Sequence, residues 1–288
     1  MATPRFSVCE ISTLNASFEE DLAAYREGGA EGIGICEFKL PADGNDAPAL
    51  SAFRASGLAA SICVPATLSI LPLPSMPGPA EPAERVAALC ASLRRLTPFQ
   101  PASCVCLTGP RGGLQESEAR RLVVDGLRRI ARTAGELGMR VALEPVHSSI
   151  RDDWTLVSSI PETLELLAEV GEPDVGILFD VWHLWDTPDI FELARLHAKR
   201  IAGVHINDWQ KSSRGWKDRA LPGEGVANLP AILGALEAGG YHGWYDLEIF
   251  SDDGSFGDNY PDSLWKVPPV EVVRRGRDGF LRAWTARH

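Results

Sequence analysis

Four side chains that can bind a metal ion lie in short apolar segments of the second half of the chain. Glu144 follows Ala142 by two residues, so the alternation of a strand places both on one face. The other three are Asp180 at the end of GILFD, His205 in GVHIN and Glu248 in WYDLEIF. If these segments are consecutive parallel strands, the four side chains meet near one end of the sheet.

These four residues together are predicted to hold a cation. Buried carboxylates are costly when unpaired, and three of them around one imidazole repel one another unless a positive charge intervenes. A mostly oxygen ligand set suits manganese, magnesium or cobalt better than a structural zinc. We predict one divalent ion, with Mn²⁺ favoured and Mg²⁺, Co²⁺ or Zn²⁺ as alternatives. The competing interpretation is that all four are independent buried or ion-paired groups.

Such a cation would support proton transfer next to a ketone. It would grip the ketone oxygen and a neighbouring hydroxyl and stabilise the enediolate formed when a carbon-bound proton leaves. Glu144 and Glu248 are the predicted pair that takes and returns this proton. His183, three residues after Asp180, could polarise a substrate oxygen, or simply bond a neighbouring carboxylate at the rim. Arg219 could bind substrate oxygens with its forked donors, or form an ordinary loop salt bridge.

Tryptophans gather in the segments that follow Asp180 and His205. They are Trp182, Trp185, Trp209 and Trp216. We predict that Trp182 and Trp185 contact the substrate, because indole faces stack on sugar rings or on an aromatic aglycone; packing of long loops is the alternative. The segment 251–265 carries four aspartates, which would repel a phosphate group and therefore indicate an unphosphorylated substrate.

The elements that would position these residues alternate between strand and helix. Apolar runs, helical periodicity and two capping-box patterns, Ser17 with Glu20 and Ser159 with Glu162, define the segments. The predicted strands are 6–12, 32–38, 59–66, 103–109, 140–146, 175–181, 201–207 and 244–250. The predicted helices are 17–28, 47–56, 83–96, 116–137, 161–170, 190–199, 229–238 and 270–286.

Eight strand–helix units demand parallel pairing, which leaves a doubly wound sheet or a closed barrel. No glycine-rich phosphate fingerprint follows the first strand, and 288 residues suit an α/β barrel of about 250 residues. The longest predicted strand-to-helix loops are 67–82, 208–228 and 251–269, at the end where such barrels bear their active sites. We predict a single (β/α)₈ TIM-barrel domain over residues 1–288.

Several motifs make the chain similar to known barrels. The sequence resembles the sugar isomerase and epimerase branch of the xylose isomerase-like TIM barrels, including inosose isomerases and ketose 3-epimerases. The matching segments are ALEPV at 142–146, FDVWH at 179–183, GVHIND at 203–208, DRALPGEG at 218–225 and WYDLEIF at 244–250. The resemblance implies Glu144, Asp180, His205 and Glu248 as metal ligands. It also implies that His183 and Arg219 bind substrate oxygens.

Composition restricts the partners. A net charge of −11 without a basic stripe argues against nucleic acids and anionic membranes, and relatives that cleave DNA use histidines from early strands, whereas here none precedes His147. Six cysteines without CxxC spacing are interpreted as buried reduced thiols, which indicates a reducing compartment. The amino-terminal residues lack a signal-peptide pattern, so a cytoplasmic location is predicted. The sequence does not choose between a monomer, a homo-oligomer and a complex with a partner subunit.

Three functions compete at this stage. The favoured one is a divalent-metal-dependent isomerase or epimerase of an unphosphorylated ketose or keto-inositol. The second is a lyase or dehydratase on the same scaffold, such as the catalytic subunit of a C-glycoside deglycosidase acting on 3-keto-glycosides. The third, a non-catalytic sugar-binding barrel, is disfavoured because all predicted ligands and both predicted bases are present.

Overall fold

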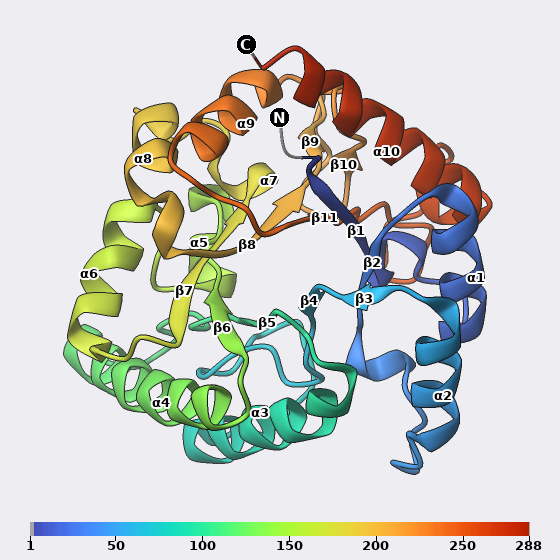
Figure 1. The fold of residues 1–288 in the computed structure, drawn as a ribbon. Helices are drawn as coiled ribbons and strands as arrows, with labels where there is room; N and C mark the ends of the chain where they lie inside the picture. Colours follow the sequence, from blue (N-terminus) through green and yellow to red (C-terminus); the bar gives the residue numbers. More distant parts are fainter. Residues whose placement is uncertain (1–2, 288) are drawn as a thin grey trace.

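The computed structural model describes residues 3–287, and its strands form a closed parallel ring (Figure 1). β1 (Arg5–Cys9) pairs on one side with β2 (Gly32–Gly34) and on the other with β11 (Trp244–Leu247). The ring continues through β8 (Ile201–Ile206), β7 (Val175–Asp180), β6 (Arg140–Leu143) and β5 (Ser103–Cys106) to β4 (Ile62–Cys63). β3 (Ala59–Ala60) pairs with β2 and continues into β4 after one residue, so these two pieces occupy a single position and close the ring.

Helices surround this ring (Figure 1). One follows each strand position, and two further short helices, α5 (Arg151–Trp154) and α7 (Val181–Leu184), lie in the loops after β6 and β7. The surrounding helices are α1 (Phe18–Gly28), α2 (Ala47–Ser56), α3 (Pro82–Leu96), α4 (Glu116–Glu136), α6 (Ile160–Val170), α8 (Ile190–His197), α9 (Leu229–Ala238) and α10 (Pro269–Thr285). The predicted (β/α)₈ barrel is therefore confirmed.

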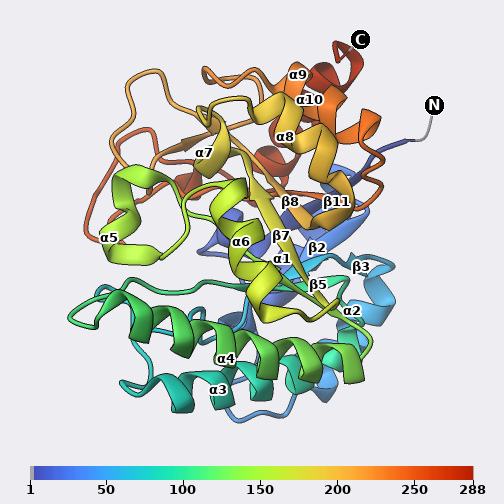
Figure 2. The same cartoon turned by 90° about the vertical axis from the view of Figure 1, so that its left-hand side faces the viewer.

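The side view shows where the loops gather (Figure 2). α5 and α7 lie toward one side of the ring, at the carboxyl ends of the strands that precede them. The loop after β8 contains a small antiparallel hairpin of β9 (Asp208–Trp209) and β10 (Arg219–Ala220). The long predicted loop 208–228 is thus partly ordered by its own hairpin.

Helix α1 begins at the predicted capping box, whereas the second predicted box is incomplete. Ser17 accepts from the Glu20 amide, and the Glu20 carboxylate accepts from the Ser17 amide. Ser159 likewise caps α6 by accepting from the Glu162 amide. The Glu162 carboxylate, however, accepts from the Ser158 amide and from Arg151, because that ion pair draws it away from Ser159.

The strands end earlier than predicted, and β1 and β2 illustrate the difference. β1 stops at Cys9 and β2 at Gly34, and 3₁₀ turns of Glu10–Thr13 and Glu37–Lys39 follow within the predicted strand segments. The reason is a side-chain contact: the buried Glu10 carboxylate accepts a hydrogen bond from the Cys36 amide at 2.8 Å.

The interior of the barrel is apolar at mid-height. Ala142 packs there with Ile62, Val105 and Leu178, which confirms that Ala142 faces inward. A second, larger apolar layer lies between the sheet and the surrounding helices. With Ala142 inside, Glu144 two residues later is directed to the inner rim.

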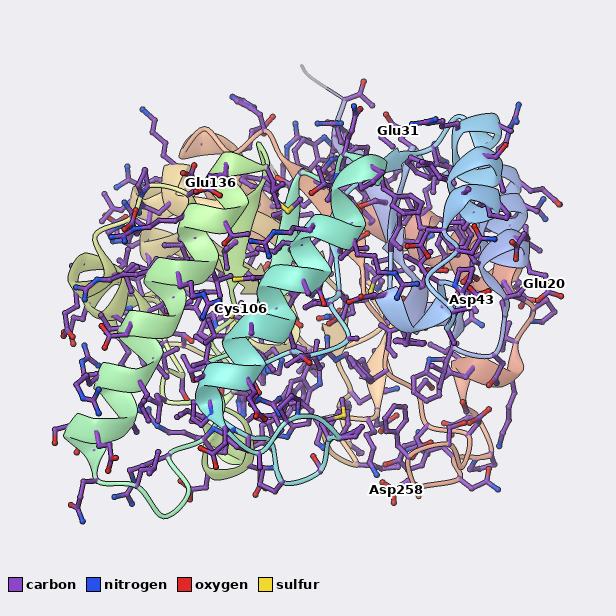
Figure 3. The ribbon with its side chains drawn as sticks, turned by 90° about the horizontal axis from the view of Figure 1, so that it is seen from below. Glu20, Glu31, Asp43, Cys106, Glu136 and Asp258 are labelled. Atoms are coloured by element: carbon purple, nitrogen blue, oxygen red, sulfur yellow. The ribbon has the colours of Figure 1, made fainter. Side chains whose placement is uncertain are left out.

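Charged and apolar groups separate as expected for a globular chain. Figure 3 shows acidic side chains at the outside of the ribbon, among them Glu20, Glu31, Asp43 and Glu136. All six cysteines are buried and free, which agrees with their interpretation as unpaired buried thiols. Among the described residues, no helix is both long enough and apolar enough to span a bilayer.

Candidate active site

The four predicted metal ligands meet at the carboxyl ends of four neighbouring strands. Asp180 is the last residue of β7, His205 pairs with it from β8, and Glu144 and Glu248 directly follow β6 and β11. One ligand atom from each lies within 4.8 Å of the others, and all four side chains are buried. The strand order β6–β7–β8–β11 therefore converts four distant sequence positions into one cluster.

The atoms of this cluster fit a divalent cation. His205 Nδ1 lies 3.2 Å from Glu248 Oε2, 3.7 Å from Glu144 Oε1 and 4.0 Å from Asp180 Oδ2. Ligands bonded to one ion at about 2.1 Å are separated by about 3–4 Å. His205 Nδ1 and Glu144 Oε1 are buried and have no hydrogen-bond partner. These atoms have no partner and lie at the separations of metal ligands, so a cation could bind them.

Arg219 reaches the cluster from the β9–β10 hairpin. Its Nη1 donates to Asp180 Oδ2 at 2.7 Å and to Glu248 Oε2 at 2.6 Å. The guanidinium neutralises one of the three carboxylate charges, so two negative charges remain when His205 is neutral. The two positive charges of a divalent cation would balance these two negative charges.

Asp180 is held in one orientation by groups outside the cluster. Its Oδ1 accepts from the Trp182 amide at 2.7 Å and from Asn207 Nδ2 at 2.9 Å. These bonds leave Oδ2 directed at Arg219 and His205. Asn207 was not predicted as a site residue, although it stands two residues after His205, on the same face of that segment. Its role is to orient a ligand carboxylate.

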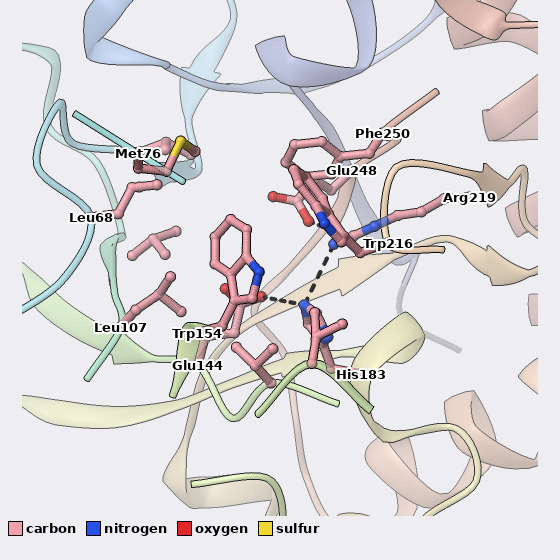
Figure 4. A pocket seen from close by; sticks show the side chains of 14 residues that line it. Leu68, Met76, Leu107, Glu144, Trp154, His183, Trp216, Arg219, Glu248 and Phe250 are labelled. Carbon is pink, nitrogen blue, oxygen red and sulfur yellow. Dashed lines mark hydrogen bonds and ion pairs between the residues drawn. The ribbon is translucent and has the colours of Figure 1, made fainter. Parts of the chain in front are cut away.

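His183 presents a defined nitrogen to the pocket. The His147 backbone amide donates to His183 Nδ1 at 3.1 Å, so the neutral ring carries its proton on Nε2. Nε2 lies 3.9 Å from Glu144 Oε1 and 3.7 Å from Asp180 Oδ2, and Arg219 Nη2 at 3.5 Å is itself a donor, so in this tautomer it contacts Nε2 without a hydrogen bond (Figure 4). Burial, aided by the Arg219 charge, lowers the pKa of His183 to about 3. His183 is therefore a neutral Nε2–H donor.

The protonation of the cluster itself follows from its crowding. Burial, together with the charges of Glu248 and Asp180, raises the pKa of Glu144 to about 7. Burial opposes charging of His205, but the carboxylates of Glu248 and Glu144 outweigh it and raise the pKa of that imidazole. Protons thus occupy the cluster near neutral pH in the absence of a metal, and a cation would have to displace them.

The predicted tryptophan contacts are placed differently from the other site residues. Trp182 is 1% exposed and stacks on Trp209 with ring centroids 4.4 Å apart, and Trp185 also packs against Trp209. These indoles form a packed group with His147 beside the site. The alternative interpretation of loop packing describes these three indoles, because Trp182 is carried by the short helix α7 whose residues are all buried.

A pocket opens directly over the cluster. It has an open volume of about 540 Å³, and its polar lining comprises Glu144, His183, Arg219 and Glu248 (Figure 4). Two tryptophans, Trp154 and Trp216, line the pocket and contact each other edge to face, with ring centroids 5.0 Å apart. Trp154 was not predicted, since α5 follows β6 without a motif of its own.

Asp246 is a buried acid next to the cluster, and the sequence analysis assigned it no role. It precedes Glu248 by two residues, so strand alternation directs both to the interior, and it pairs in register with His205. Both carboxylate oxygens and His205 Nε2 are buried without a hydrogen-bond partner, although the hydroxyls of Ser7 and Ser61 lie near enough to affect its pKa. Burial raises the pKa of Asp246 to about 7. Asp246 therefore lies beside His205 in the sheet and interacts with it through charge, without a hydrogen bond to its ring.

This arrangement can be compared with known proteins. A family described as "Xylose isomerase-like TIM barrel" matches residues 22–284. The chain belongs to this family. The predicted resemblance is therefore confirmed at the level of family and fold.

Among curated relatives, this xylose isomerase-like barrel is 28% identical to an inosose isomerase of Halalkalibacterium halodurans over 47% of this chain and 48% of the relative. It is 29% identical to an inosose dehydratase of Geobacillus thermodenitrificans over 46% and 47% of the two chains. The chain thus spans about half the length of these curated relatives in the matched regions.

Solved structures agree over nearly the whole length. A Sinorhizobium meliloti 1021 protein has a TM-score of 0.82 at 25% identity, covering 97% of this chain and 98% of its own. The IOLI protein with a bound zinc atom has a TM-score of 0.79 at 19% identity, covering 99% of each chain. An L-ribulose 3-epimerase has a TM-score of 0.77 at 21% identity, covering 98% and 96%. The last two likenesses concern the fold alone.

Proposed function

We propose that this xylose isomerase-like barrel is a divalent-metal-dependent isomerase or epimerase of an unphosphorylated ketose or keto-inositol. The observation that carries the proposal is the cluster of Glu144, Asp180, His205 and Glu248 at the floor of a pocket. Relatives named inosose isomerase support the substrate class, and the zinc bound to the structurally similar IOLI protein supports a metal. Mn²⁺ is the ion that we favour because the ligand set is rich in oxygen.

The residues divide the work as follows. A bound divalent cation would supply electrophilic stabilisation of negative charge on the substrate oxygens. Glu144 can take a carbon-bound proton, and Glu248 can return it on the other side. His183 donates its Nε2–H to a substrate oxygen. Arg219 holds Asp180 and Glu248 in place and offers its remaining donors to the substrate.

Loss of water or of another leaving group is the second candidate. The relative named inosose dehydratase matches about the same share of the chain as the isomerase does. Both reactions begin when a base removes a proton next to a carbonyl, and they differ in whether a group on the next carbon then leaves. Cleavage of a 3-keto-glycoside, with a partner subunit, belongs to this second class.

Proton exchange tests both candidates at once. The protein would be loaded with Mn²⁺ and incubated in deuterated water with ketoses, inososes and keto-glycosides, and carbon-bound deuterium would be measured by NMR and mass spectrometry. We expect one class to exchange, with a stereoisomer as product for an isomerase and an unsaturated product for a dehydratase. If no compound exchanges in the loaded protein, the proton-transfer proposal is wrong.

A further inference from the structure

The pocket over the cluster has one polar wall and a much larger apolar one. Figure 4 shows Glu248, Arg219 and His183 to one side of the pocket and Leu68, Met76 and Leu107 to the other. Of the fourteen lining residues, ten are aliphatic, aromatic or methionine side chains. All four polar ones belong to the cluster and its two neighbours.

The apolar wall continues into an adjoining cavity. That cavity has an open volume of about 1010 Å³ and shares Val64, Leu68, Met76, Glu248 and Phe250 with the first pocket. It extends along the segments after the early strands to Phe38, which is 53% exposed. The charged cluster therefore lies at the edge of an extended apolar surface.

Polar groups do not compensate for this surface. Besides Glu248, the charged side chain that lines the adjoining cavity is Arg85. Its guanidinium already donates to Ser69 and to the Pro79 carbonyl. A polyol with a hydroxyl on every carbon would therefore face side chains that offer its outer hydroxyls only the indole N–H groups of Trp154 and Trp216 as partners. Burying unpartnered hydroxyls is unfavourable, whereas burying an aromatic ring there is favourable.

The shape of the apolar wall suits a flat group. The ring planes of Trp154 and Trp216 meet edge to face at an angle of 68°. The ring planes of Trp216 and Phe250 meet at 71°, with ring centroids 5.4 Å apart. These contacts hold the rings of Trp216 and Phe250 beside Arg219 and Glu248, and Figure 4 draws Trp154 between them and the flexible side chains of Leu68 and Met76. A planar substituent can lie between rigid rings and adaptable side chains.

We propose that the substrate is a keto-sugar or keto-polyol that carries an aromatic substituent, and that the substituent occupies the apolar side of this pocket. The polar end of the substrate rests on the function proposed above. The apolar subsite rests independently on Leu68, Met76, Trp154, Trp216 and Phe250.

A matched pair of probes tests the subsite. Phenyl and methyl 3-keto-β-D-glucopyranoside differ only in the aglycone, and their dissociation constants for the Mn²⁺-loaded protein can be measured by calorimetry. We expect the phenyl compound to bind about 10- to 100-fold more tightly, the factor for burying one aromatic ring. Leu68→Asn and Met76→Gln should each reduce that preference at least about threefold while leaving the methyl compound unaffected.

A control separates the subsite from general damage. Phe191 on α8 is 42% exposed and does not line the pocket, so Phe191→Asn should keep the full phenyl preference. Leu68 and Met76 are only partly buried, so their polar variants should fold, which circular dichroism would verify. Equal binding of both probes to the wild-type protein would overturn the subsite. Equal loss for both probes in Leu68→Asn would also overturn it.

The two proposals fail in different ways. Exchange of deuterium into an unsubstituted ketose, without any preference for the phenyl probe, would overturn the aromatic subsite and leave proton transfer intact. A phenyl preference that depends on Leu68, without exchange into any compound, would support the subsite and overturn proton transfer.

Discussion

The two halves of the barrel mouth are built from the same kind of strand ends but carry opposite chemistry. In the later half, β6, β7, β8 and β11 deliver the buried cluster of Glu144, Asp180, His205 and Glu248. In the earlier half, the residues that line the pocket are apolar, among them Val64, Leu68 and Leu107, and the buried Glu10 after β1 bonds the Cys36 amide instead of lining the pocket. The earlier half contributes none of the ligand atoms of that cluster.

This difference shows how one pocket can both react and select. Arg219 lowers the mutual repulsion of the carboxylates collected on one side, and the proposed cation would lower it further. The apolar side excludes water from that charge and strengthens interactions within the cluster. If this division is correct, changes in the later half should abolish chemistry, whereas changes in the earlier half should alter binding.

Metal removal should have the largest effect. The purified protein should hold about one divalent ion per chain, and chelation should abolish turnover because the cluster then holds protons or Arg219 alone. Elemental analysis, followed by reconstitution with Mn²⁺, measures this. Activity that is indifferent to a chelator, in a protein without bound metal, would contradict the division of the mouth.

Substitution of either glutamate should come next. Glu144→Gln and Glu248→Gln keep a ligand oxygen but remove the base, so metal content should largely persist while turnover falls about 10²- to 10⁴-fold. Turnover and metal content would be measured on the same preparation. Near-wild-type turnover in both variants would show that the proton moves through other groups.

Asp246→Asn should weaken the metal without removing a ligand. The Asp246 carboxylate interacts with His205 through charge but does not hydrogen-bond its ring, so its neutralisation should lower metal affinity by about tenfold, the lower end for a carboxylate next to a ligand histidine. Titration with Mn²⁺ monitored by electron paramagnetic resonance gives that affinity. Asp253→Asn is a matched control on the loop after β11, and it should leave the affinity unchanged.

His183→Ala should affect the substrate more than the metal. Its Nε2 faces the pocket but is not among the four ligand atoms, so metal occupancy should stay near normal. Binding or polarisation of the substrate should weaken, by about tenfold for one lost hydrogen bond to a polar group. A site emptied of metal by this variant would mean that His183 belongs to the ligand set.

The pH dependence of the metal-free protein should be the smallest effect. Glu144 and Asp246 have pKa values raised to about 7, whereas unfolded carboxyls titrate near about 4. These two carboxyls hold more protons in the folded state over this range and outweigh His183, whose lowered pKa acts in the opposite direction, so the free energy of unfolding should fall as pH rises from about 4 to 7. Urea unfolding at pH 5 and 7 measures this, and Glu144→Gln should flatten the slope.

Part of the site could be predicted from the sequence because strand alternation is a local property. Alternation places Ala142 and Glu144 on one face, and it does the same for Asp246 and Glu248. The first pair was interpreted correctly, whereas in the second pair only Glu248 was assigned to the site. Trp182 and Trp185 show the limit of this reasoning. Their positions after a strand predicted the loop, but not which side of the loop each indole would pack against.

The sequence was enough to predict the barrel and the convergence of four candidate ligands, because strand alternation and helix capping act over a few residues at a time. Tertiary structure decided how Arg219 reaches Asp180 and Glu248 through the β9–β10 hairpin, and how His147 sets the His183 tautomer. It also decided that Trp154 and Trp216 face one pocket. These contacts join segments far apart in the chain, and loop packing rather than local propensity selects them.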